Sequence, residues 1–219
     1  MTRRQRISRL RRTDSFRRTP GNKPPRSITL IICEGETEQT YFNAARIRYG
    51  LTTAEVVLAD NTVGSAPISV VQCAEAKSRE PGGYDTIFCV FDRDSHESFD
   101  RARERIHTLA ERTRKPLPIH EAISIPCFEF WVLLHFERTD APFTCCDEVT
   151  RRVRNHIVNY EKADTAIARS LMDQVEYAKE NADWLEGSAE DSSQNPYTSV
   201  HYVLRHFEQI AQRNTSHNP

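Results

Sequence analysis

Two short runs of nearly continuous apolar residues are the clearest feature in the hydrophobic pattern of this chain. They cover Ile28–Gly35 and Thr86–Asp94, and both end in acidic residues. Because successive side chains of a strand point to opposite faces, a run that is apolar throughout predicts a strand buried on both faces. Two further short segments, Ala54–Ala59 and Pro118–Ser124, predict two more strands.

Apolar residues at helical spacing separate the predicted strands. Helices are predicted at Glu36–Tyr49, at about 68–80 and at about 97–112, so that strands and helices alternate. This order predicts an α/β fold with a parallel sheet of about four strands, flanked by helices and joined by right-handed crossovers. The rest of the chain is predicted to be helical at Cys127–Phe136, Asp147–Asn159, Thr165–Trp184 and Ser199–Arg213, with a polar loop at Glu186–Asn195.

These elements divide the 219 residues into three parts. Residues 27–136 are expected to form the α/β core, and residues 137–219 a helical extension packed on it. No apolar stretch approaches the roughly 20 residues of a membrane-spanning helix, and the start lacks the apolar segment of a secretory signal. The six cysteines show no spacing typical of zinc. A cytoplasmic protein without membrane association is therefore expected.

Residues 1–26 form a strongly basic leader, which the net charge of −1 conceals. They contain ten basic residues and one acid, whereas the rest of the chain contains 20 basic and 30 acidic residues. This leader is predicted to be a disordered arm that binds nucleic-acid phosphates. A solvated tail without a partner and a mitochondrial targeting peptide are the alternatives. The candidate contacts are Arg9, Arg11, Arg12, Arg17 and Arg18.

Acidic residues follow both apolar strands. Glu34 and Gly35 end the first strand, and Asp92 and Asp94 end the third. The carboxyl ends of parallel strands meet at one edge of the sheet, where ligands of α/β proteins usually bind. Acidic groups that converge there repel one another unless a cation holds them, which indicates Mg²⁺, a hard ion with oxygen ligands.

Some of the acidic residues near these strand ends also have a structural alternative. Glu36 and Glu38 lie inside the predicted helix and suit the role of charges that complement a helix dipole. Asp92 and Asp94 are two residues apart in extended chain, so both side chains can reach one metal. Asp94 could instead cap the helix that follows.

The pairing of Glu34–Gly35 with Asp92-x-Asp94 resembles the toprim domain of topoisomerases, primases and several nucleases. Longer motifs resemble the RloB family, over about residues 26–210, and the basic leader is also similar. The resemblance implies a toprim-like (Rossmann-like) sheet. The motifs are Leu30–Phe42, Phe91–His96, Ile125–Phe136 and Asn195–Val200.

The resemblance also implies a metal-dependent phosphodiesterase. Glu34 is the expected metal ligand or general acid/base, and Asp92 and Asp94 are expected to hold Mg²⁺ or Mn²⁺. Glu129 is either a further metal ligand or a charge at the start of a helix. Lys162 either neutralises an oxyanion in the transition state, as a lysine does in related toprim nucleases, or is a solvated surface lysine.

Other polar residues near these motifs leave alternatives open. Arg93 and His96 either contact substrate phosphate or are structural. His135 is expected to be a core histidine with a satisfied hydrogen bond, and Asn195–Thr198 either supports the site or caps the last helix.

The function implied is a nuclease of bacterial anti-phage defence, acting on DNA or RNA, possibly transfer RNA, beside an ATPase partner. A non-catalytic nucleic-acid-binding or regulatory subunit of such a defence complex is the alternative. Assembly into a homo-oligomer stays open.

Overall fold

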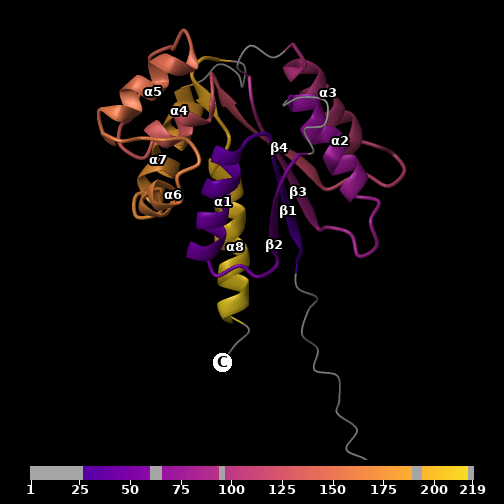
Figure 1. The fold of residues 1–219 in the computed structure, drawn as a ribbon. Coiled ribbons are helices and arrows are strands. Elements are labelled where there is room, and N and C mark those ends of the chain that lie inside the picture. Colours follow the sequence, from indigo (N-terminus) through magenta and orange to yellow (C-terminus); the bar gives the residue numbers. More distant parts are fainter. Residues whose placement is uncertain (1–26, 60–65, 94–96, 189–193, 217–219) are drawn as a thin grey trace, which may run out of the picture.

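A computed structural model of the chain describes residues 27–59, 66–93, 97–188 and 194–216. Its centre is a five-stranded sheet in the order β2-β1-β3-β4-β5 (Figure 1). The predictions for the basic leader, including Arg9, Arg11, Arg12, Arg17 and Arg18, and those for Asp94 and His96 lie outside the described residues.

Four strands of the sheet are parallel, which confirms the predicted α/β class. They are β1 (Thr29–Cys33), β2 (Ala54–Leu58), β3 (Thr86–Asp92) and β4 (Ile119–Ile125). The interior strand β1 is buried at every position, as its continuous apolar run predicts. A fifth strand, β5 (Tyr197–Thr198), pairs antiparallel with the end of β4. It comes from the segment that we predicted to support the site or to cap the last helix, and two residues are too few to show a strand pattern.

Helices cover both faces of the sheet (Figure 1). One core cluster joins β1 and β3 to α1 (Glu36–Arg48) and α8 (His201–Ser216) through residues such as Ile31, Phe42, Val90 and Phe207. The other cluster packs the opposite strand faces against α2 (Pro67–Lys77) and α3 (Phe99–Ala110). β1 and most of β3 are thus shielded from water on both faces.

Four helices form a group beside the sheet: α4 (Phe128–Leu133), α5 (Cys146–Arg154), α6 (Thr165–Leu171) and α7 (Val175–Ser188). The single helix predicted at Thr165–Trp184 is therefore wrong. The chain breaks at Met172–Gln174, where each backbone N–H donates to the carbonyl three residues earlier. Buried residues on both sides of the break keep helical spacing, so the hydrophobic pattern does not indicate the break. The predicted helices at Cys127–Phe136 and Asp147–Asn159 end earlier than expected, at Leu133 and Arg154.

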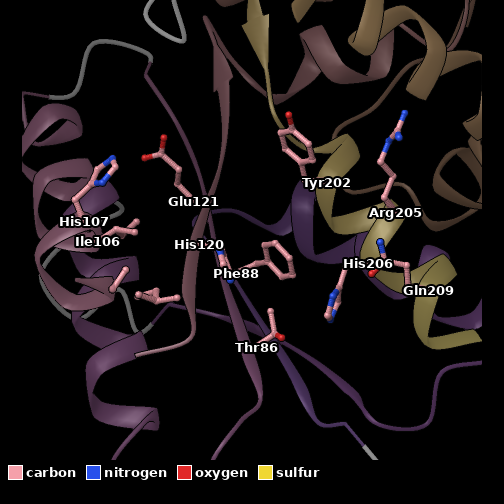
Figure 2. Close-up of a pocket in the computed structure, with 12 residues that line it drawn as sticks. Thr86, Phe88, Ile106, His107, His120, Glu121, Tyr202, Arg205, His206 and Gln209 are labelled. Carbon is pink, nitrogen blue, oxygen red and sulfur yellow. The ribbon is translucent and has the colours of Figure 1, made fainter. Parts of the chain in front are cut away.

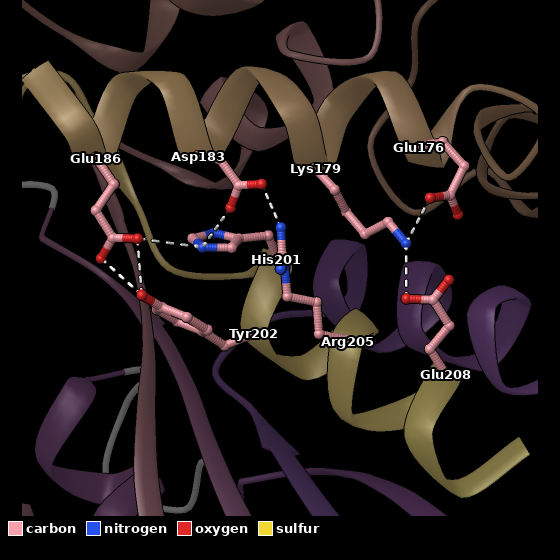
Figure 3. Close-up of polar contacts among 8 residues, drawn as sticks. All are labelled: Glu176, Lys179, Asp183, Glu186, His201, Tyr202, Arg205 and Glu208. Atoms are coloured by element: carbon pink, nitrogen blue, oxygen red, sulfur yellow. Dashed lines mark hydrogen bonds and ion pairs between the residues drawn. The ribbon is translucent and has the colours of Figure 1, made fainter. Parts of the chain in front are cut away.

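Polar contacts join α7 to α8 (Figure 3). Lys179, whose side chain is 6% exposed, lies 2.7 Å from Glu176 and 3.0 Å from Glu208 of α8. His201, fully buried at the start of α8, lies 3.5 Å from the Glu186 carboxylate. Burial lowers the pKa of His201. These contacts hold α8 against α7, while the apolar residues of α8 pack against the sheet.

A cavity of about 670 Å³ lies between α3 and α8 (Figure 2). Its floor includes Phe88, whose ring contacts the rings of His120 and His206. β5 pairs only with Ser124 and Ile125, so the first half of β4 borders this cavity. The cavity lies toward the amino ends of the strands, away from the acidic residues that end β1 and β3. Within the described ranges, no helix is long and apolar enough to span a membrane.

His135 is a core histidine, as predicted. Its Nδ1 lies 3.0 Å from the Trp131 carbonyl oxygen, which can only accept, so Nδ1 carries the proton. Nε2 therefore accepts a hydrogen bond from the Tyr41 hydroxyl at 3.0 Å. Burial lowers the pKa of His135 to about 4, so the ring is neutral at pH 7.

Tyr41→Phe is expected to destabilise the protein by about 1–2 kcal/mol, because it leaves His135 Nε2 buried without a donor. Tyr49→Phe is the matched control, since the buried Tyr49 hydroxyl has no hydrogen-bond partner among the described residues. Urea unfolding should show little change, or a gain, for Tyr49→Phe. Equal losses in the two variants would contradict the assignment of the Tyr41–His135 hydrogen bond.

Candidate functional site: an acidic pocket at the carboxyl ends of the strands

The ends of β1 and β3 bring Glu34 and Asp92 together. These strands are parallel neighbours with Cys33 opposite Val90, and the Glu34 N–H donates to the Val90 carbonyl at 3.0 Å. The Asp92 N–H in turn donates to Glu34 Oε2 at 3.3 Å. The Glu34 carboxylate therefore lies over the end of β3. Glu34 is only 7% exposed, so this carboxylate is largely shielded from water.

The end of β4 supplies a third wall. The chain leaves β4 through a cis peptide bond between Ile125 and Pro126 and enters α4 at Phe128. The Phe128 N–H donates to Asp92 Oδ2 at 3.0 Å. The Asp92 side chain thus connects the end of β3 to the start of α4.

Glu38 is a member of this site that our reading of the sequence missed. We interpreted it as a charge that complements the helix dipole, but it is 6% exposed and lines the pocket. A Cβ atom at Gly35 would lie 2.7 Å from Glu38 Oε2, so glycine permits the close approach. A signal was available: Glu38 falls on the same helical face as the buried Tyr41, Phe42 and Ala45.

Glu129 and Lys162 form an ion pair at the rim. Glu129, in the first turn of α4, is 2% exposed, and its Oε1 lies 2.9 Å from Lys162 Nζ. The Lys162 side chain is 61% exposed. Burial lowers the pKa of Lys162, but the Glu129 carboxylate outweighs it and the net shift is upward. Ala163, the next residue, has left-handed backbone with a φ of 59°, a conformation that is strained for a residue with a Cβ.

The pocket that these residues enclose has a volume of about 410 Å³ and a large excess of negative charge. Burial raises the pKa of Glu38 to about 7, with smaller contributions from Glu129 and Glu34. Burial and the Glu38 carboxylate also raise the pKa of Asp92 well above its usual range. Among the described residues, one cation, Lys162, lines the pocket, together with the carboxyl groups of Glu34, Glu36, Glu38, Asp92 and Glu129.

This donor set fits a hard divalent cation in chemical type and in charge. All the ionisable groups that line the pocket, apart from Lys162, offer carboxylate oxygen, the ligand that Mg²⁺ prefers. No three His, Cys, Asp or Glu side chains of the described residues are already grouped as a metal site. Asp94, the other predicted ligand, is outside those residues.

The backbone of Arg93 takes part in the sheet. Its N–H donates to the Ser124 carbonyl at 3.0 Å, which extends the pairing of β3 with β4 past Asp92. The predicted phosphate contact of its side chain stays a prediction.

A model of the RloB-like protein family matches residues 29–207, from the start of β1 into α8. This chain belongs to the RloB-like family. Glu34, Glu38, Asp92, Glu129 and Lys162 of the RloB-like chain all lie within the matched segment. No curated protein and no solved structure shows a significant match.

The stability of this RloB-like protein without metal is expected to fall as the pH rises from about 5 to about 7.5. Glu38 has an ordinary pKa of 4.5 when unfolded and about 7 when folded, so in this window the folded state binds more protons. The free energy of unfolding should therefore fall by on the order of 2 kcal/mol. Asp92, whose pKa is also raised, acts in the same direction.

Urea unfolding in EDTA across this pH range checks the expectation. Glu38→Gln should show a smaller fall in stability than the parent, because glutamine is neutral throughout and leaves only the contribution of Asp92. Glu36→Gln, which removes an exposed carboxylate from the same helical turn, is the matched control and should behave as the parent does. A Glu38→Gln variant with the pH dependence of the parent would show that Glu38 does not contribute to the fall in stability.

Proposed function

We propose that this RloB-like protein is a metal-dependent nuclease that hydrolyses phosphodiester bonds of DNA or RNA at the acidic pocket. One observation carries the proposal: mostly buried carboxylates from the ends of adjacent parallel strands converge in a pocket where Lys162 is the one cation among the described lining residues. Such an arrangement costs free energy, since buried charges are stable only when they are paired. A divalent cation would remove that cost and supply the chemistry that phosphate hydrolysis needs.

The residues divide into ligands and groups that handle charge. Glu34 and Asp92 are the proposed ligands, with Asp94 beyond the end of β3 and Glu129 at the rim. A bound Mg²⁺ or Mn²⁺ would stabilise negative charge on the phosphate and lower the pKa of a water ligand. Lys162, held by Glu129 at the mouth of the pocket, is placed to neutralise charge that develops on the phosphate oxygens.

Glu38 is the proposed proton carrier of the site. A carboxyl group that titrates near neutral pH can hold or release a proton under working conditions. Gly35 allows it to reach the pocket from the first turn of α1.

The wider role follows from the resemblance of the motifs to RloB proteins of phage-defence loci. On that basis we propose action in the cytoplasm in anti-phage defence with an ATPase partner, and transfer RNA as one candidate substrate. The toprim-like arrangement of Glu34 and Asp92 on adjacent parallel strands is consistent with this proposal.

Metal binding is testable without any knowledge of the substrate. Mg²⁺ or Mn²⁺ should raise the Tm of the parent protein in differential scanning fluorimetry, and more at pH 8 than at pH 5.5, because the cation competes with protons for the carboxylates. Asp92→Asn should lose most of the shift, whereas Asp140→Asn, which removes an exposed carboxylate outside the pocket, should keep it. A shift that is equal in both variants would place the cation elsewhere.

Nuclease activity is tested by incubation of the protein with DNA and with RNA in Mn²⁺ or Mg²⁺, and by sequencing of the cleaved ends. Asp92→Asn should lower cleavage by at least about a hundredfold, the scale of losing a main stabilising group in a transition state, while circular dichroism shows a folded protein. Cleavage that persists in EDTA would contradict the metal mechanism. A protein that binds nucleic acid but does not cleave it, with or without an ATPase partner, would favour the non-catalytic subunit instead.

A further inference from the structure

A second cavity, of about 530 Å³, adjoins the acidic pocket. Lys162 lines both, so its side chain stands on the boundary between them. The remaining wall comes mainly from α5, through Thr150, Arg151 and Arg154, and from Tyr160. The two cavities therefore adjoin at Lys162.

The charge of this second cavity is opposite to that of the first. Arg151, Arg154 and Lys162 contribute three cations, and Asp147 is the single acid among the lining residues. Arg151 and Arg154 are exposed, and neither forms an ion pair within the described part of the chain. Because they are three residues apart on a helix, their side chains share one face.

The neighbouring arginine of α5 shows that this exposure is selective. Arg152 pairs with Glu137 through its Nε, and its guanidinium lies over the Phe143 ring. Val149 and Val153 are fully buried and hold the inner face of α5 against the core. In α5, Arg152 therefore makes contacts within the fold, whereas Arg151 and Arg154 face the cavity.

We propose that this second cavity binds a backbone phosphate of the nucleic-acid substrate next to the phosphate that enters the acidic pocket. The inference rests on the proposed nuclease function and adds where the polyanion lies. An acidic pocket does not by itself attract a polyanion, because like charges repel. Two unpaired guanidinium groups beside that pocket supply the attraction, and their planar forks suit two oxygens of one phosphate.

The test compares two double variants that remove the same charge. Arg151→Ala/Arg154→Ala alters the cavity. Arg112→Ala/Arg114→Ala is the matched control, because these exposed arginines lie between the end of α3 and the start of β4, at the opposite end of the strands from the pocket. Binding of fluorescein-labelled single-stranded RNA, single-stranded DNA and duplex DNA is measured by fluorescence anisotropy with the full chain, in EDTA, across a range of salt concentrations.

Arg151→Ala/Arg154→Ala is expected to weaken binding about tenfold near physiological salt. It should also lower the slope of log K against log salt by about 0.7 on single strands or about 0.9 on duplex DNA, the values for one phosphate contact. The control pair should change both quantities by much less. Arg151→Lys/Arg154→Lys should keep the salt slope while it binds more weakly than the parent, since lysine retains the charge and loses the fork.

The probe with the largest difference between the two double variants identifies the kind of backbone that the cavity accepts. Equal weakening in the two double variants, or no weakening in either, would overturn the inference while parent binding and cleavage leave the proposed nuclease intact. A parent protein that neither binds nor cleaves any of the three probes would overturn both. Circular dichroism melting of each variant shows that a loss of binding does not come from unfolding.

Discussion

The site depends on a chain of two hydrogen bonds between carboxylates and backbone amides. Glu34 accepts from the Asp92 N–H, and Asp92 accepts from the Phe128 N–H. Each bond joins the end of one element to the start or end of another, so the ends of β1 and β3 and the start of α4 are held together by acidic side chains. Hydrogen bonds to carboxylates are stronger than those between neutral groups, yet they place negative charges close to one another.

The rest of the pocket can be understood as a response to that charge. Lys162 neutralises Glu129 at the rim, and Glu38 keeps a proton up to a pH of about 7. Neither response is complete, because Asp92 is still driven toward its protonated form. Buried acidic groups that destabilise the folded state in this way cluster at functional sites. A divalent cation would offset the repulsion between these carboxylates, so the same acidic groups that destabilise the metal-free protein would favour cation binding.

The sequence was most informative where one pattern had one structural solution. Two nearly continuous apolar runs and two further short segments predicted the four parallel strands, and the strand ends then placed Glu34 and Asp92 side by side. Glu38 was missed because an acid in the first turn of a helix has an ordinary explanation in the helix dipole. Its position on the apolar face of α1 was a sign that it is buried, and the packing of α1 shows that this turn faces the pocket.

Other features depend on contacts between distant segments, which a local pattern cannot contain. The helix break at Met172–Gln174 lies within uninterrupted helical spacing, and β5 is too short to show alternation. The pairing of Lys162 with Glu129 joins residues 33 positions apart, and no spacing rule connects them. The second cavity, between α5 and Lys162, likewise depends on the packing of α5 beside Lys162.

The central claim is that the acidic pocket holds a divalent cation, and crystals grown with Mn²⁺ test it most directly. Anomalous diffraction at the manganese edge locates the ion independently of activity, substrate and stability. The account predicts a peak within about 2.0–2.6 Å of carboxylate oxygens of Glu34 and Asp92, the range for hard cations with oxygen ligands. Crystals that contain Mn²⁺ and show no anomalous peak in this pocket, or a peak only at other residues, would contradict it.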